Sequence, residues 1–89
     1  MDPGVQAAIR RLPRHKNAIE ELVLFSESFR GLCGDLAEAE ATLRLWQESG
    51  ESGAAARCLE YTHIIDGLEA ELRQVLHERQ APSREPRQN

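Results

Sequence analysis

The residues of this chain whose types and spacing come closest to a reactive site are Glu60 and His63, with Asp66 one turn further on. A glutamate followed three residues later by a histidine is the ligand spacing of di-iron helix bundles, and a homodimer would supply two copies. Such ligands must point into the bundle. These three residues instead lie off the apolar stripe of their helix, on the solvent side. We therefore expect no metal and no cofactor, and keep a metal-binding bundle only as the last alternative.

No other group of residues has the pattern of a catalytic site. Ser26 and Ser28 are placed to cap a helix, and Cys33 and Cys58 are placed to pack, so no nucleophile has a neighbouring base. The glycines of the 50–53 turn follow a helix and not a strand, which argues against a phosphate-binding loop. We therefore expect the protein not to be an enzyme and to have no catalytic residue.

Two long amphipathic helices organise the chain between residues 26 and 80, with a turn at 47–53. Apolar residues recur at steps of three and four on each arm, which keeps one stripe of each helix facing a partner. They are Phe29, Leu32, Leu36, Ala39, Leu43 and Trp46 on the first arm, and Cys58, Tyr61, Ile65, Leu68, Leu72 and Val75 on the second. Because a short polar turn makes the helices antiparallel neighbours, the prediction is an all-α, coiled-coil-like helical hairpin.

A short helical segment at 3–25 precedes the hairpin. Asp2 followed by Pro3 is a good helix start, and Pro13 ends or kinks the first short helix. The apolar residues expected to face inward are Val5, Ala8, Ile9 and Leu12 on the first short helix, and Ala18, Ile19, Leu22 and Val23 on the second. Residues 1–80 are thus expected to form one helical domain, with 81–89 as a disordered tail.

The formal net charge of −4 in 89 residues disfavours a general nucleic-acid binder, which needs a positive surface. Basic residues cluster where the two short helices meet, at Arg10, Arg11, Arg14, His15 and Lys16. Two interpretations stay open, a contact to RNA or anionic lipid and a solvated face, and the lack of interleaved aromatic residues favours the second. Within the hairpin we expect i,i+4 ion pairs of Glu40 with Arg44 and of Glu69 with Arg73.

The cysteines and the N-terminus favour a cytoplasmic location. In the hairpin register Cys33 and Cys58 lie ten residues apart along the helices, roughly 15 Å, whereas a disulfide needs Cα atoms within ~7 Å. We expect two reduced thiols, with Cys58 in the seam between the helices and Cys33 beside it. The N-terminus lacks the continuous apolar region of a signal peptide, and the longest run of large apolar residues, 22–25, is too short to span a membrane.

A bare two-helix hairpin has no interior, so either the N-terminal segment packs on it as a third helix or hairpins associate. Leu59, Ile64 and Leu76 widen the stripe of the second arm beyond what one partner helix covers, which predicts self-association into at least a dimer, as a helix bundle. The alternative is an adaptor or regulator that binds a different protein through its hairpin. Gly31 and Gly34, on the outward side of the first arm, are either tolerated there or let another backbone approach in an oligomer.

The residues expected at the core or interface are Phe29, Leu32, Leu36, Leu43, Trp46, Tyr61, Ile64, Ile65, Leu68, Leu72, Val75 and Leu76. One family has a similar layout. A Phe-x-x-Leu motif, Phe29-Arg30-Gly31-Leu32, opens the first long helix, and a polar Gly/Ser turn and a returning helix at 59–76 follow. With the short helical N-terminus, this resembles the YdcH-like family of small bacterial proteins, although Asp35-Leu36-Ala37-Glu38 stands where that family has His-x-x-Leu-Asp. The resemblance implies a coiled-coil hairpin without an established activity.

Overall fold

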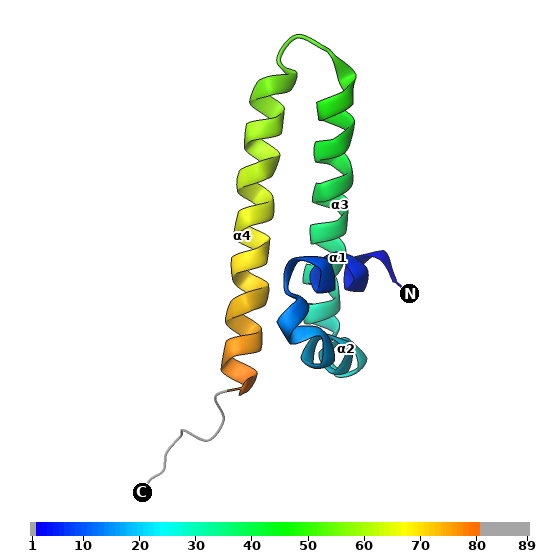
Figure 1. The fold of residues 1–89 in the computed structure, drawn as a ribbon, viewed down its shortest axis with the longest axis vertical. Coiled ribbons are helices and arrows are strands. Elements are labelled where there is room, and N and C mark those ends of the chain that lie inside the picture. Colours follow the sequence, from blue (N-terminus) through cyan, green and yellow to red (C-terminus); the bar gives the residue numbers. More distant parts are fainter. Residues whose placement is uncertain (1, 81–89) are drawn as a thin grey trace, which may run out of the picture.

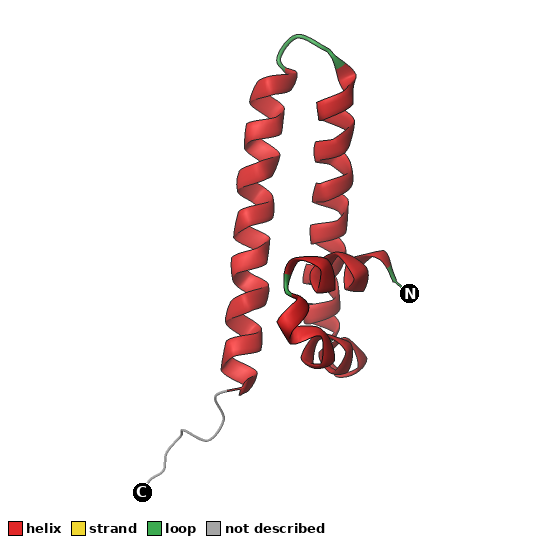
Figure 2. Cartoon of the chain, viewed as in Figure 1, coloured by secondary structure: helices red, strands yellow, loops and turns green. Residues whose placement is uncertain are grey.

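The computed structural model describes residues 2 to 80, which form helices and short connections with no strand among them (Figure 2). The elements are α1 (Pro3–Arg11), a 3-10 turn η1 (Pro13–His15), α2 (Lys16–Phe25), α3 (Glu27–Ser49) and α4 (Ala54–Gln80). The all-α class predicted from the sequence is confirmed. The tail expected at 81–89 lies outside the described residues.

Helices α3 and α4 form an antiparallel hairpin with their arms side by side (Figure 1). The connection is shorter than the predicted turn, because α3 continues through Ser49. Gly50 (φ 70°) and Gly53 (φ 87°) bound it, both in the left-handed region that glycine enters without steric cost. Gly50 is the C-cap residue of α3, a common place for such a glycine. The predicted hairpin is therefore present, with a tighter turn.

One short helix, α1, and one long helix, α3, begin at capping residues that the sequence indicates. The carboxylate of Asp2 accepts a hydrogen bond from the Val5 N–H at 3.1 Å, and Pro3 stands in the first turn of α1. The hydroxyl of Ser26 accepts from the Phe29 N–H, also at 3.1 Å, and so caps α3. The two caps fix where the N-terminal segment and the hairpin start.

The two short helices pack on one end of the hairpin (Figure 1). Helix α1 crosses α3 and also reaches α4, while α2 lies beside the beginning of α3. Their buried apolar side chains are Val5, Ala7, Ala8 and Leu12 on α1 and in the link after it, and Ile19 on α2. The other residues expected to face inward are partly buried against the same core: Ile9, Ala18, Leu22 and Val23. The hairpin thereby gains the interior that two helices alone would lack.

The twelve residues expected at the core or interface differ widely in exposure. Fully or almost fully buried are Phe29, Leu36, Ile65, Leu72 and Leu76; half-buried are Leu32, Leu43, Trp46, Tyr61, Leu68 and Val75. Ile64 is 40% exposed. Cys33, predicted as a packing residue beside the seam, is 0% exposed, because α1 packs over that side of α3. The buried surface of α3 is therefore wider than its heptad stripe.

Leu76 lies beside the apolar stripe of α4, and its place there suggested an apolar side chain that a single chain leaves uncovered. This side chain is in fact covered. It is 0% exposed within one chain and belongs to the same buried cluster as Ile19 of α2. An ion pair between Arg79 and Glu21, at 2.9 Å, joins this end of α4 to α2. The expectation that a single chain leaves this part of α4 uncovered is therefore wrong.

Candidate interaction face

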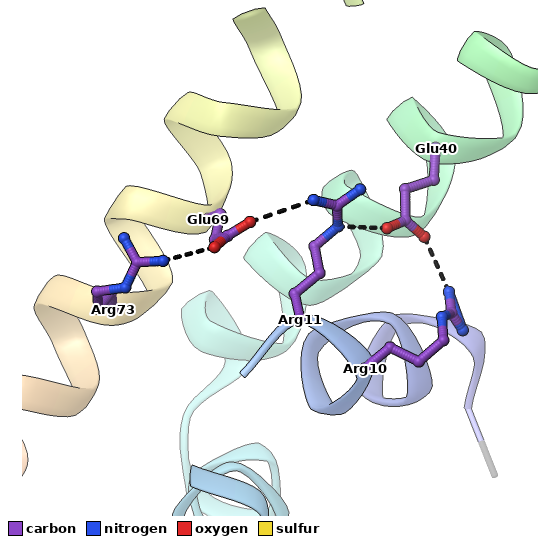
Figure 3. A network of polar contacts seen from close by, with 5 residues as sticks. All are labelled: Arg10, Arg11, Glu40, Glu69 and Arg73. Carbon is purple, nitrogen blue, oxygen red and sulfur yellow. Dashed lines mark hydrogen bonds and ion pairs between the residues drawn. The ribbon is translucent and has the colours of Figure 1, made fainter. Parts of the chain in front are cut away.

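Five charged residues join α1 to both arms of the hairpin (Figure 3). Arg11 donates through Nε to Glu40 on α3 and through Nη1 to Glu69 on α4, the second at 3.1 Å. Arg10 also donates to Glu40, at 2.9 Å, and Arg73 donates to Glu69. Because the Arg11 guanidinium lies between two carboxylates from different helices, it holds α1 across the seam of the hairpin.

Burial and hydrogen bonding shift the pKa values of Glu40 and Arg11 in opposite directions. The side chain of Glu40 is only 12% exposed, and burial would raise the pKa of its carboxyl group, but hydrogen bonds from Arg11 and Arg10 outweigh burial and lower that pKa. Burial would likewise lower the pKa of Arg11, yet its hydrogen bonds to Glu40 and Glu69 raise it. Both groups are therefore charged when α1 is docked.

The network changes two interpretations of the sequence. The expected pair of Glu40 with Arg44 is wrong, because the Glu40 carboxylate is held by the two arginines of α1, whereas the pair of Glu69 with Arg73 is confirmed. The basic cluster is also more than a solvated face. Its first two members, Arg10 and Arg11, bond to carboxylates of the hairpin, so they are not free cations for RNA or lipid.

Acid should lower the free energy of unfolding in the pH range where Glu40 takes up a proton. Because folding lowers the pKa of Glu40, its contribution to the free energy of unfolding is full above the ordinary value of 4.5 and is lost as pH falls through the lower folded value. Urea unfolding followed by circular dichroism should show a falling midpoint from about pH 5 to about pH 3. A Glu40→Gln variant should lose less over that range. Equal acid sensitivity of the two proteins would contradict this role.

The crossing of α1 over α3 requires a glycine on α1. A Cβ on Gly4 would lie 2.7 Å from the carbonyl carbon of Cys33 and 2.8 Å from the backbone nitrogen of Gly34. The backbone of α1 therefore passes close to the backbone of α3 at Cys33 and Gly34. A Cβ on Gly31 or on Gly34 itself would meet nothing within 4 Å, so the steric requirement rests on Gly4.

Cys33 lies beneath this crossing and is protected by it. Burial raises the pKa of the Cys33 thiol to about 11, and the negative charge of Asp2 adds to the rise. A thiol with that pKa is almost wholly protonated at neutral pH and is therefore a poor nucleophile. Cys33 therefore serves as a packing residue. Both cysteines are free, and Cys58 is half-buried.

Thiol reagents should distinguish the two cysteines. In the folded protein we expect iodoacetamide to modify Cys58 and to leave Cys33 unmodified at about pH 8, because only a solvent-accessible thiolate reacts. Mass spectrometry of the digested protein measures both sites. The same protein in urea is the control, since unfolding should expose both thiols. Fast modification of Cys33 in the folded protein would show that α1 is not docked as described.

The residues considered for metal binding do not form a site. Glu60, His63 and Asp66 are exposed on α4, and the carboxylate of Glu60 accepts a hydrogen bond from Arg57 at 3.0 Å. Within residues 2 to 80, no group of three or more His, Cys, Asp or Glu side chains is arranged to hold a metal ion.

A groove of about 320 Å³ runs between α3 and α4 on the face opposite α1. Cys33 and Glu40 lie on the side of α3 that α1 covers. Asp35 follows Cys33 by two residues, and Thr42 follows Glu40 by two residues. Each step turns about 200° around the helix, so Asp35 and Thr42 lie on the other side of α3. The groove is lined by Asp35, Glu38, Ala39 and Thr42 of α3 and by Tyr61, Ile64 and Leu68 of α4. Ile64 is 40% exposed, Tyr61 and Leu68 are half-buried and Ala39 is buried, so the apolar floor of this groove is partly open to solvent.

The sequence indicates only part of this groove. Tyr61, Ile64 and Leu68 were expected at a core or interface, and the structure brings them together on one face. The polar residues on the α3 side were missed as site residues. The available signal was spacing, since Asp35 and Thr42 lie four residues before and three after Ala39 and so share an edge of the helix with it.

No family model, curated protein or solved structure matches this chain. The similarity to the YdcH-like family, drawn from the Phe-x-x-Leu motif and the order of the helices, therefore stays a prediction. Among the helices described between residues 2 and 80, none combines the length and apolarity that crossing a lipid bilayer demands.

Proposed function

We propose that the protein is a non-enzymatic interaction module that binds a helix of another polypeptide in the groove between α3 and α4. One observation supports this most strongly: α1 packs on one face of the hairpin, and the groove on the opposite face has an apolar floor that is partly open to solvent. Apolar surface is more stable when a partner covers it. A cytoplasmic location is part of the proposal, and the two free thiols are compatible with it.

A helix fits this groove better than an extended segment does. The two arms are antiparallel neighbours, and a third helix laid between them would pack as the helices of a bundle do. On α4, the floor residues Tyr61, Ile64 and Leu68 recur at steps of three and four. That spacing matches a helical partner with apolar residues at i, i+3, i+4 and i+7.

Self-association stays a prediction, and its basis is narrower than the sequence suggested. Leu76 is covered by its own chain, and only Leu59 (62%) and Ile64 (40%) of the three surplus residues are exposed. These two are five residues apart, about 140° around α4, so they do not form one stripe. Sedimentation equilibrium across micromolar concentrations tests the prediction. A dimer would favour a second copy in the groove, and a single 10.0 kDa species would favour a different protein.

The proposed function is tested by one substitution in the groove and a matched one outside it. Ile64→Arg places a charge on the floor of the groove, and Asp66→Arg places the same charge on an exposed position of another side of α4. Both variants should fold, because neither side chain is buried. Proteins that co-purify with the tagged wild type from its native cell should be lost with Ile64→Arg and kept with Asp66→Arg. Identical sets of co-purifying proteins in all three preparations would contradict the proposal.

A further inference from the structure

The groove between α3 and α4 has an acidic rim. Asp35 and Glu38 line it on α3. On α4, the exposed Glu71 follows Leu68 by three residues, which places it on the same edge of the helix. None of these three carboxylates makes an ion pair with another described residue. The rim therefore carries negative charge that residues 2 to 80 leave uncompensated.

The described arginines of the hairpin are bonded to other groups or lie on the α1 side, where Arg44 lines a pocket with Arg10 and Arg11. Arg57, at the loop end of the same edge of α4, donates to Glu60 at 3.0 Å, and its guanidinium lies 5.8 Å from the centre of the Trp46 ring. Arg11 and Arg73 belong to the network on the face that α1 covers. The arginines of the network thus lie on the covered face, and the groove on the open face has carboxylates without an ion-pair partner among the described residues.

We infer that the groove takes an amphipathic helix of a different protein, with lysine or arginine on both sides of its apolar stripe. This inference rests on the proposed function and specifies its partner. Opposite charges across an interface speed association and select the partner, whereas like charges repel. A second copy bound face to face would bring its own Asp35, Glu38 and Glu71 against the same three carboxylates. The charge pattern therefore favours a basic helix over self-association.

The length of the open face sets the length of the partner. The groove extends on α4 from Tyr61 to Leu68. At ~1.5 Å rise per residue this distance is roughly 11 Å, so a partner helix needs at least about two to three turns to cover it.

Two synthetic peptides test the charge of the partner directly. Both have about 18 residues and the same stripe of leucines for the groove; one has lysines beside the stripe and the other has glutamates at the same positions. Each is labelled with fluorescein, and its binding to the full chain is measured by fluorescence anisotropy at moderate salt. We expect the lysine peptide to bind about tenfold more tightly than the glutamate peptide, since it pairs with several rim carboxylates.

Matched charge reversals show whether the rim causes this preference. Asp35→Lys/Glu38→Lys should abolish or reverse it. Glu48→Lys/Asp66→Lys makes the same change in net charge at exposed positions outside the groove and should keep it. Equal binding of the two peptides to the wild type, or an equal loss in both double variants, would overturn the inference while leaving a helix-binding groove in place.

Two further outcomes separate this inference from the proposed function. If Ile64→Ser leaves the binding of the lysine peptide unchanged, the groove is not where it binds, and the proposed function loses its support as well. If neither peptide binds, the inference is overturned. A dimer in sedimentation that Ile64→Arg dissociates would then assign the groove to a second copy.

Discussion

Gly4→Ala should destabilise the protein by about 2 to 3 kcal/mol, as overpacking of a close contact does. The new Cβ would lie 2.7 Å from the carbonyl carbon of Cys33 and 2.8 Å from the nitrogen of Gly34. Both are backbone atoms in the middle of a long helix, so neither can turn aside as a side chain could. Helix α1 must move away from α3, and the ion pairs of Arg11 with the hairpin weaken with it. Urea unfolding followed by circular dichroism measures the loss.

Gly31→Ala is the matched control for this prediction. Its Cβ would meet nothing within 4 Å, and alanine favours a helix by roughly 1 kcal/mol over glycine, so this variant should be more stable than the wild type. If Gly→Ala lowers the free energy of unfolding at position 4 and raises it at position 31, the crossing with α1, and not helix propensity, decides the result at position 4. If Gly4→Ala were also stabilising, α1 would not lie against α3 as described.

Leu36→Asp should leave the protein unfolded in buffer at room temperature. Leu36 is 0% exposed on α3, and an aspartate there would be buried among apolar side chains without a partner. Truncating a buried leucine alone costs about 2 to 5 kcal/mol, and an unpaired charge adds to that. A domain of this size has about 5 to 10 kcal/mol of stability in total. The far-ultraviolet circular dichroism of the variant should therefore show loss of helix.

Glu38→Asp, two residues away on the exposed side of α3, should melt almost as the wild type does. The pair compares a buried and an exposed position on one helix. Two variants that both melted like the wild type would show that the assignment of the core face of α3 is wrong.

The local features of the fold could be read from the sequence because each has a signature within a few residues. The steps of three and four between Phe29 and Trp46 identify the buried side of α3. The capping roles of Asp2 and Ser26 follow from residue types before a helix, and the glycines at 50 and 53 indicate the reversal between the arms.

The docking of α1 could not be read in this way, because it depends on contacts between distant residues. Arg11 lies 29 residues from Glu40 and 58 from Glu69, and no periodic pattern joins them. Within its own helix, Glu40 has a favourable partner in Arg44, so local reasoning selects the wrong pair. The need for glycine at position 4 is a consequence of the same crossing and was missed with it.

Only part of the open groove could be predicted from the sequence, for a related reason. Ile64 was recognised as apolar surface beyond the seam, but which face stays open depends on where α1 and α2 pack. Leu76 is, like Ile64, a large apolar residue of α4. Because α2 packs at the end of α4 where Leu76 lies, Leu76 is 0% exposed. Tertiary packing, and not hydrophobicity alone, therefore separates the interface candidate from the core residue.

A photo-crosslinking amino acid at position 64 tests the central claim most directly. In the native cell, benzoylphenylalanine in place of Ile64 should give covalent adducts with a partner protein, because this side chain lies on the floor of the groove. The same amino acid in place of Asp66, exposed on another side of α4, is the control and should give none of those adducts. Adducts to one partner from position 64 alone are the predicted result. Identical adducts from both positions, or none from position 64, would contradict an interaction face between α3 and α4.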